Sequence, residues 1–362
     1  MTRPHQVRFL SDTAGALDVV VKLTVVHSTR LFMEWLAYKR STIASSHCNH
    51  VLSLRNALSL SLSYRCTQCT ESAACHCSPL CLLSGRSIMA EDMQRAVGDV
   101  LKRVLMVPPT HFTVEYTINP WMGGVVDKDK AQKQWSDLKV AIEKEGVKVD
   151  TLDHVKGLPD MVFVCNSGIV RGNKVYLSRF QHKERTGEQE HYLKWFEQQG
   201  FEIYGRDYVD HFEGGGDACF SSYDTLWAGF GPRSNKSVYE KISALGDFDT
   251  VICELKLPQF YHLDTCFCPV SEKAALWYPP AFSVATQEAI KKRLPDSIAV
   301  SDKEANAFVC NAITIRKTVI SPIGVSQDTK DRLAKIGYSV TEVDMSEFMK
   351  SGGACQCLVL KL

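Results

Sequence analysis

The sequence predicts an α/β fold in which five units of strand, strand, helix and strand form a ring. The first observation is a repeat, because the letters FVCN occur at residues 163–166 and again at residues 308–311. Apolar stretches, an amphipathic segment ending in Gly and an alternating stretch follow each copy, and they predict strands around one helix. Three further segments repeat this order with a period of about 40–50 residues, which is typical of rings and arrays.

The five units follow one another along the chain. The first has a strand from residue 103, a helix over 130–146 and a strand over 147–153. The other four cover residues 161–205, 217–255, 263–301 and 306–344, and each has two strands, a helix and a third strand. The first unit lacks one strand, and the final CQCLVLKL is predicted to supply it. FVCN is predicted to be the inner strand of two units, with its Cys and Asn approaching the central axis.

Composition points to a soluble, enzyme-sized protein. The chain has 362 residues, 45% of them hydrophobic, and 42 basic against 41 acidic residues. This balance gives no indication of a nucleic-acid or anionic membrane partner, and no apolar run reaches the ~18–20 residues that span a bilayer. Eight of the 14 cysteines are dispersed through strand-like stretches, as reduced cytosolic thiols are. We expect a cytoplasmic location, and the sequence leaves a homo-oligomer open.

Residues 1–88 differ from the catalytic segment expected at 89–362. They are rich in Ser, Leu and Cys and have no sustained hydrophobic period. Three interpretations compete: a transit peptide with a mitochondrial location, a metal site around Cys66, Cys69, Cys75 and Cys77, or a disordered extension with Met89 as the effective start. The last is favoured.

Polar residues recur at the inner positions where the strand ends of a ring converge. They are Asp160, Asn166, Glu213, Asp217, His262, Asp264, Asn311, Cys355 and Cys357. A thiol, an imidazole and several carboxylates together are a set for nucleophilic catalysis.

Several motifs in this region resemble one enzyme superfamily. PDMVFVCN, FEGGGDA, GPRS, FYHLDTCFCP, YPPAF and GGACQCL are similar to motifs of the guanidino-group-modifying (pentein) superfamily. Its members include dimethylarginine dimethylaminohydrolases, arginine deiminases, arginine dihydrolases and glycine amidinotransferases. The resemblance covers residues ~100–362, is greatest to arginine dihydrolases of the cyanobacterial type, and implies a five-bladed ββαβ propeller.

The resemblance implies a role for each catalytic residue. Cys357 is the nucleophile, with the adjacent Cys355 as the alternative. His262 is the general acid and base, although a lone His in this context is more often structural. Glu213 and Asp160 bind guanidinium N–H groups, since paired carboxylate oxygens match a planar cation.

Further residues complete the implied site. Arg179 and Arg233 are candidates for the substrate carboxylate, with ordinary ion pairing as the alternative. Asp217 and Asp264 orient Glu213 or His262, and Asn311 is counted with the substrate-binding residues. The mechanism passes through a thiouronium intermediate and requires no metal or organic cofactor.

Asn166 bears on the substrate. Dimethylarginine hydrolases and arginine deiminases carry Asp at this position, whereas the dihydrolases carry Asn. An amide can hold a cationic guanidinium or a neutral ureido group, so arginine dihydrolase activity is favoured. Dimethylarginine hydrolysis is the main alternative, followed by an amidinotransferase and an inactive arginine-binding scaffold. VCNSG replaces the usual dihydrolase TANAG, so Cys165 could reshape the pocket.

Overall fold

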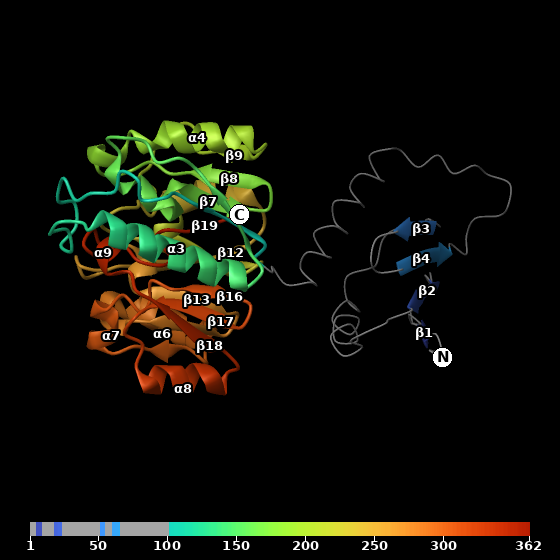
Figure 1. Cartoon of the computed structure of the whole chain (residues 1–362). Coiled ribbons are helices and arrows are strands. Elements are labelled where there is room, and N and C mark those ends of the chain that lie inside the picture. Colours follow the sequence, from blue (N-terminus) through green and yellow to red (C-terminus); the bar gives the residue numbers. More distant parts are fainter. Residues whose placement is uncertain (1–4, 9–17, 24–50, 55–59, 66–100) are drawn as a thin grey trace. The chain divides into compact units, whose positions relative to one another are not determined.

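The computed structural model describes part of the N-terminal segment and the whole C-terminal body (Figure 1). The described residues are 5–8, 18–23, 51–54, 60–65 and 101–362. The chain divides into two compact units, Met1–Ala96 and Val97–Leu362. The six N-terminal cysteines, the expected boundary at Met89 and most of the segment expected to be disordered or transit-like lie outside the described residues.

One antiparallel sheet is described in the first unit. Its strands are β1 (His5–Arg8), β2 (Asp18–Leu23), β3 (Val51–Leu54) and β4 (Leu60–Arg65), in the order β1-β2-β4-β3.

Within residues 101–362, the strands form five three-stranded sheets that match the five predicted units. They are β19-β5-β6 (Leu360–Lys361, Arg103–Met106, Lys148–Thr151), β7-β8-β9 (Gly168–Arg171, Lys174–Leu177, Glu202–Tyr204), β10-β11-β12 (Ala218–Ser222, Thr225–Phe230, Asp249–Glu254), β13-β14-β15 (Phe267–Ser271, Ala274–Trp277, Ile298–Ala299) and β16-β17-β18 (Ile313–Ile315, Thr318–Pro322, Ser339–Val343). In each sheet the first pair is antiparallel and the second pair is parallel. The C-terminal strand β19 completes the first unit, as predicted.

A helix connects the two parallel strands of every unit, because a parallel pair cannot be joined by a tight turn. These helices are α3 (Lys128–Lys144), α4 (Glu188–Gln198), α5 (Val238–Ile242), α6 (Val284–Arg293) and α8 (Gln327–Lys335). In α3 the Asp127 side chain caps the N-terminus by accepting from the Lys130 N–H at 3.0 Å, while Trp135, Leu138 and Ile142 are buried. Shorter helices α7 (Asp302–Asn306) and α9 (Ser346–Met349) are additions to the predicted pattern.

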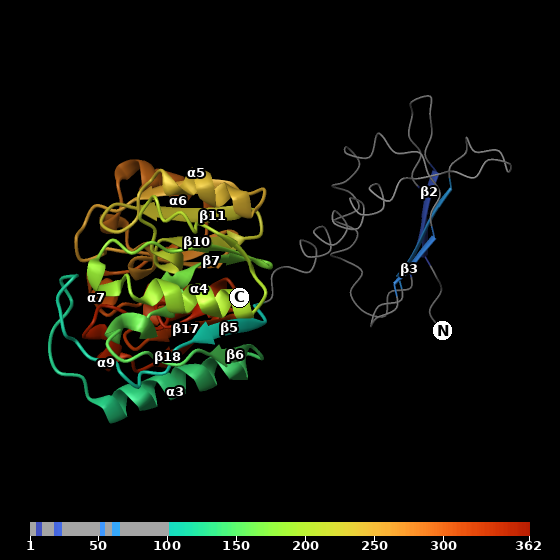
Figure 2. The same ribbon diagram turned by 90° about the horizontal axis from the view of Figure 1, so that it is seen from above.

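The middle strand of each sheet is the most buried one. In β14 all four residues are buried, whereas in β6 and β9 none is. In Figure 1, helices α4 and α8 lie at opposite ends of the second unit, with the sheets between them. In the view from above, helices α5 and α3 lie at opposite ends in the same way (Figure 2). This position explains why the middle strands are nearly continuous apolar runs.

The prediction that FVCN is an inner strand is wrong in both copies. Val164–Ser167 is a 3-10 turn, and the strand begins only at Gly168. In the second copy Phe308 has a φ of +59° and the strand begins at Ile313. Each turn closes through a hydrogen bond from the Asn N–H to the Phe carbonyl, at 3.1 Å for Asn166 and 2.8 Å for Asn311. These residues favour a strand locally, but tertiary contacts override that preference. The turn places the Asn side chain in the region where the turns of the units meet.

The candidate site residues therefore come from turns rather than from strands. Turns of the same kind precede the other first strands: Gly214–Gly216 before β10, Leu263–Thr265 before β13, and the segment with Cys357 before β19. Cys357 lies in the final CQCLVLKL that was expected to form the last strand, but that strand begins only at Leu360. Each of the five units thus contributes one turn to the same region.

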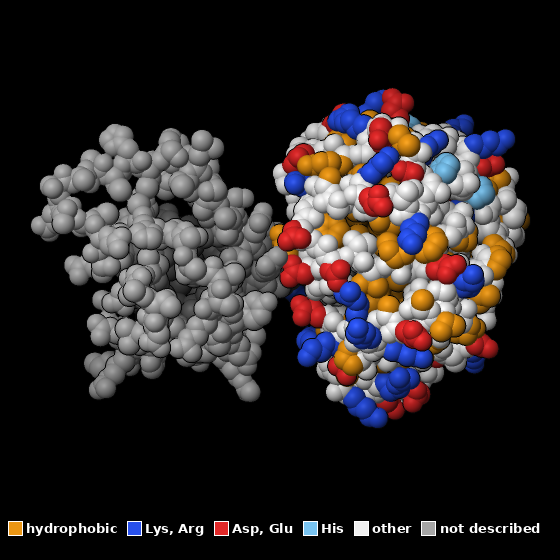
Figure 3. Space-filling model, turned by 180° about the vertical axis from the view of Figure 1, so that it is seen from behind, with side chains coloured by type: hydrophobic (Ala, Val, Ile, Leu, Met, Phe, Trp, Pro, Cys, Tyr) orange, Lys and Arg blue, Asp and Glu red, His pale blue; other side chains and the backbone are white. Residues whose placement is uncertain are grey.

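Charged side chains of both signs are interspersed with apolar ones on the face shown in Figure 3. That distribution agrees with the near-zero net charge of the chain. Among the described residues, none of the helices combines the length and apolar character that crossing a membrane needs.

Candidate active site

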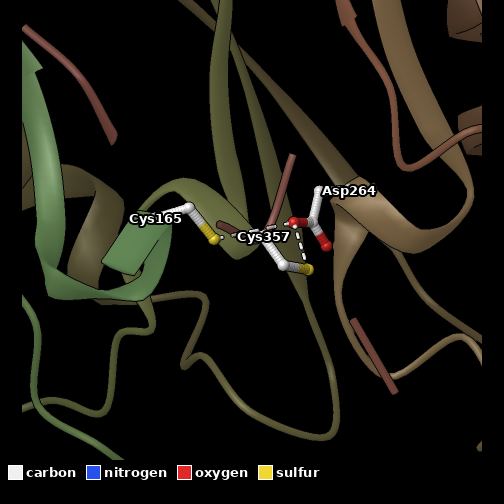
Figure 4. A group of neighbouring side chains, drawn as sticks. All are labelled: Cys165, Asp264 and Cys357. Carbon is white, nitrogen blue, oxygen red and sulfur yellow. Dashed lines mark hydrogen bonds between the residues drawn. The ribbon is translucent and has the colours of Figure 1, made fainter. Parts of the chain in front are cut away.

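The Cys357 sulfur lies against turns from two other units (Figure 4). Its Sγ is 3.2 Å from Asp264 Oδ2, and the Sγ of Cys165 is 3.8 Å from the same oxygen. The three atoms all lie within 4.8 Å of one another, and all three residues are buried. Sequence analysis assigned Asp264 to orienting His262 or Glu213, whereas its nearest polar partners are the two thiols.

Asn311 holds the turn that carries Cys357. Its Oδ1 accepts from the backbone N–H groups of Ala354 at 3.1 Å and Cys357 at 3.2 Å. Its Nδ2 donates to the Cys357 sulfur at 3.1 Å and to the Asp264 carbonyl at 3.2 Å. Asn311 therefore positions the sulfur and donates a hydrogen bond to it, which favours a charged thiolate.

Among Cys165, Asp264 and Cys357, the surroundings favour the ionised form of Cys357. Burial opposes ionisation, but hydrogen bonding from Cys165 and the nearby His262 lower the pKa of Cys357 to about 6. Burial raises the pKa of the Cys165 thiol well above its usual value. Burial and the charge on Cys357 likewise raise the pKa of Asp264 well above its usual value, which favours a proton on its carboxyl beside the sulfur.

This arrangement predicts how the reactivity of Cys357 depends on pH. A depressed thiol pKa means that the reactive thiolate is lost only as the pH falls through about 6. The rate of Cys357 alkylation by iodoacetamide, followed by peptide mass spectrometry, should therefore rise through about pH 6 and then level off. A rise centred near the pKa of a free cysteine, about 8.5, would contradict the assignment.

His262 and Glu213 form a buried pair with Arg233. His262 Nε2 is 2.7 Å from Glu213 Oε2, and Arg233 Nη1 donates to the same oxygen at 2.8 Å. Although burial opposes ionisation, Arg233 and His262 lower the pKa of Glu213 well below its usual range. An ionised carboxylate can only accept, so Nε2 of His262 carries the proton and Glu213 fixes the ring orientation.

Asp217 links the two segments that carry this pair. Its Oδ2 accepts from Ser234 Oγ at 2.6 Å, and Ser234 Oγ in turn accepts from the Glu213 N–H at 3.0 Å. Its Oδ1 accepts from the N–H of Leu263, next to His262, at 3.1 Å. This placement agrees with an orienting residue rather than with a substrate contact.

The run Gly214–Gly216 is required by the close approach of neighbouring turns. Gly214 has a φ of +55°, and a Cβ there would lie 2.7 Å from the backbone nitrogen of Gly168. A Cβ on Gly216 would collide with Asn166 Nδ2 and lie 3.0 Å from His262 Nδ1. The glycines therefore leave space for protein groups of the site.

A small cavity of about 10 Å³ opens beside Cys357. Asp160 and Asn166 line it, and both were expected to bind substrate. Asp160 accepts from Tyr116 Oη and Ser351 Oγ, each at 3.0 Å, and burial raises its pKa. The residues that line the cavity are Ile118, Asn119, Asp160, Phe163, Asn166, Arg185, Arg233, Tyr261, Ser351, Gly353 and Cys357.

Asn166 uses both ends of its amide. Its Oδ1 accepts from Arg185 Nη1 at 2.8 Å, and its Nδ2 donates to the Glu213 carbonyl at 3.0 Å. One lone pair and one N–H remain for another partner in the cavity. Arg185 is itself buried against Glu188, with its Nε 2.8 Å from Oε1.

A wider hollow of about 290 Å³ adjoins this cavity and shares Ile118, Asn119, Arg233 and Tyr261 with it. The guanidinium of Arg233 stacks over Tyr261 at 4.6 Å and donates to the Ile118 carbonyl at 2.8 Å. Arg233 thus lies where the hollow meets the cavity.

Two of the predicted residues are placed outside this group. Arg179 donates to the Val209 carbonyl and is absent from the linings of both the cavity and the hollow. Cys355 is fully buried, burial raises its pKa, and it does not belong to the group of Cys165, Asp264 and Cys357.

Sequence reasoning missed Arg185, Tyr261, Ser351 and Asn119. Arg185 and Glu188 are three residues apart before a helix, which on sequence alone looks like a solvent-exposed ion pair. No local sequence pattern distinguishes the missed residues from ordinary surface residues. Only Ser351 could have been singled out, because it directly precedes Gly352 and Gly353.

Known proteins share this fold and much of this sequence. A family model described as N,N dimethylarginine dimethylhydrolase, eukaryotic, matches residues 123–362. An uncharacterized protein of Caenorhabditis elegans is 68% identical over 268 residues, which is 74% of this chain and 96% of that protein. The dimethylarginine dimethylaminohydrolase of Mycobacterium tuberculosis is 35% identical over 72% of this chain and 86% of its own length.

The bifunctional arginine dihydrolase/ornithine cyclodeaminase ArgZ of Synechocystis is 43% identical over 72% of this chain. The chain spans only 37% of that longer relative. The N-terminal domain of ArgZ, solved in covalent complex with a reaction intermediate, matches with a TM-score of 0.69 at 42% identity. That match covers 72% of this chain and 97% of the domain.

The five units of the fold and the matches to these relatives place the chain among the guanidino-group hydrolases of the pentein superfamily. The chain belongs to the N,N-dimethylarginine dimethylhydrolase family.

Proposed function

We propose that the chain hydrolyses the guanidino group of free arginine, taking it in two steps to ornithine, two ammonia and carbon dioxide. Cys357 is the observation that supports a guanidino hydrolase: its buried sulfur accepts from Asn311 Nδ2 and contacts Asp264, and the nearby His262 helps to lower its pKa. The cationic substrate adds to the stabilisation of the thiolate, and the small cavity must widen toward the adjoining hollow to admit it.

In the proposed mechanism Cys357 Sγ attacks the guanidinium carbon and forms a tetrahedral species. His262 gives its proton to the departing ammonia, and a thiouronium intermediate remains on the sulfur. The same imidazole then takes a proton from water, which attacks the carbon and releases the ureido product with the thiolate. Glu213 keeps the ring oriented through both proton transfers, since its carboxylate stays ionised.

Asp160 and Arg233 complete the proposed substrate contacts. Asp160 offers carboxylate oxygens to guanidinium N–H groups inside the cavity, and Arg233 offers N–H groups to the substrate carboxylate at its edge. Asp264, next to the sulfur, can shift its proton as the charge on Cys357 is consumed and restored.

Asn166 supports two hydrolytic steps rather than one. The guanidinium of arginine is a cation, whereas the ureido group formed by the first step is neutral and presents an oxygen acceptor. The amide has one N–H and one lone pair left after its contacts with Arg185 and Glu213, so it can bind either group. The greater identity to the dihydrolase ArgZ, 43% against 35% for the M. tuberculosis enzyme, points the same way.

Hydrolysis of dimethylarginine to citrulline is the second candidate. It is favoured by the family model, whose description names that activity in eukaryotes. The two candidates share Cys357, His262 and Glu213 and differ in the fate of the ureido carbon.

We predict that the full chain, given arginine with a carbon-13 guanidino carbon, releases the label as bicarbonate together with ornithine. Asn166→Asp should stop most of the label at citrulline, because a carboxylate cannot donate to the Glu213 carbonyl or to a ureido oxygen. NMR of the labelled carbon measures both outcomes. Asn173→Asp, in an exposed turn, is the matched control and should behave as the parent.

Two other results would contradict the proposed two-step hydrolysis of arginine. If the parent releases citrulline alone, and does so mainly from dimethylarginine, the single-step hydrolase is correct and the amide of Asn166 is structural. If neither substrate is consumed while Cys357 still alkylates at neutral pH, the chain is an arginine-binding scaffold.

We also propose that the five sheets close into a propeller. The pairing of β19 with β5 and the contacts between neighbouring first strands support this. Thr314 Oγ1 of β16 donates to the Pro269 carbonyl of β13 at 3.0 Å, and Cys268 Sγ donates to the Ala312 carbonyl at 3.2 Å.

A further inference from the structure

Two buried thiols meet at the proposed active centre, although 192 positions along the chain separate them. Cys165 and Cys357 each lie three residues before the first strand of their own unit, at Gly168 and Leu360. Their sulfurs lie within 4.8 Å of each other, with Asp264 as a common neighbour (Figure 4). In the proposed hydrolysis only Cys357 forms a covalent bond, and Cys165 does no more than help to lower the pKa of Cys357.

The backbones of the two residues are also joined. The Cys165 N–H donates to the Cys357 carbonyl at 3.2 Å. Standard bond lengths then keep the two Cα atoms within about 7 Å, and disulfides span about 4.4–6.8 Å between Cα atoms. Rotation of the two side chains can therefore bring the sulfurs to bonding distance without moving either unit.

The two thiols differ in reactivity. Cys357 lines the small cavity and is the thiolate of the pair, whereas Cys165 is absent from the cavity lining and burial keeps it protonated. A small oxidant that enters the cavity meets Cys357 first, since the free space is close to that of one water molecule. The oxidised sulfur then has the Cys165 sulfur within 4.8 Å, outside the cavity lining.

We infer that Cys165 is a resolving thiol that captures oxidised Cys357 in a reversible disulfide and so protects the nucleophile. In the first step the Cys357 thiolate attacks hydrogen peroxide, forming a sulfenic acid and releasing hydroxide. In the second step the Cys165 sulfur attacks the sulfenic sulfur, and the S–OH oxygen leaves as water with the thiol proton. A dithiol reductant restores both thiols by exchange.

Asp264 contributes to the second step by its position. Its Oδ2 is within reach of both sulfurs, and its Oδ1 is buried without a hydrogen-bond partner among the described residues. The carboxyl can therefore give a proton to the departing hydroxyl and recover one from Cys165, so that charge does not build up in the buried site.

The test treats the full chain with hydrogen peroxide, blocks free thiols, and maps disulfides by mass spectrometry of non-reduced peptides. The expected result is a linked pair of peptides containing Cys165 and Cys357, two hydrogens lighter than their sum, which dithiothreitol separates. The result that overturns the inference is Cys357 found only as sulfinic or sulfonic acid, or joined to another cysteine. This readout does not depend on activity, so it stays decisive if the proposed function fails.

Activity supplies a second readout, and here the inference rests on the proposed role of Cys357. Each protein is compared with its own untreated sample. The parent should lose activity with peroxide and regain it with dithiothreitol, whereas Cys165→Ala and Cys165→Ser should lose it permanently. Cys355→Ala, which removes a buried thiol outside the group, should recover like the parent. Full recovery of both Cys165 variants would overturn the inference.

Discussion

Replacing Cys357 with Ala is expected to abolish turnover, with kcat/KM falling by at least about 10⁴-fold. The sulfur forms the bond to the guanidino carbon in the proposed mechanism, and no other described thiol lies with it beside Asp264 except Cys165. Steady-state release of ammonia from arginine and from dimethylarginine measures the loss. The effect should be in kcat, since the substrate contacts of Asp160 and Arg233 stay in place.

Cys355→Ala separates the two thiols that the sequence left as alternatives. Cys355 is fully buried and carries a neutral thiol, so its removal should leave kcat within a few-fold of the parent and cost mainly some stability. If Cys355→Ala lost activity as completely as Cys357→Ala while its circular dichroism stayed native, the nucleophile would have to be reassigned.

Removing the imidazole in His262→Ala should lower kcat/KM by about 10²–10⁴-fold. Both the departing amine and the attacking water need the proton transfers that the imidazole of His262 provides in the proposed mechanism. The loss should also change the pH profile, because the thiolate of Cys357 loses one of the groups that lower its pKa. Stopped-flow and steady-state rates across pH measure both effects.

His211→Ala is the matched control for this variant. His211 lies two residues before Glu213, but its ring contacts the Phe180 carbonyl at 3.2 Å and lines neither the cavity nor the hollow. Its kcat/KM should stay near that of the parent. Equal losses in the two variants, with the pH profile unchanged, would show that His262 has only a structural role.

The candidate site was predictable from sequence wherever a repeat or a motif marked it. Asn166 and Asn311 were found because FVCN occurs twice, and Glu213, His262 and Cys357 because their motifs resemble those of known hydrolases. The strand assigned to FVCN was wrong because β-branched and aromatic residues favour a strand locally, while the tertiary contacts of Asn166 and Asn311 require a turn there. The place of Arg185 in the site could not be predicted, because its ion pair with Glu188 differs from a surface ion pair only in being buried.

By itself, the sequence determined the five-unit architecture, the pairing of the last strand with the first unit, and the identity of the chemical groups. Hydrophobic periodicity and repetition are properties of the sequence itself, so they can be recognised without a structure. Only the tertiary structure decided which groups touch: Asp264 lies against the thiols, Asn311 against the Cys357 sulfur, and Cys165 behind it. These contacts join turns from different units, and no local pattern specifies the distance between residues that the fold brings together from far apart in the chain.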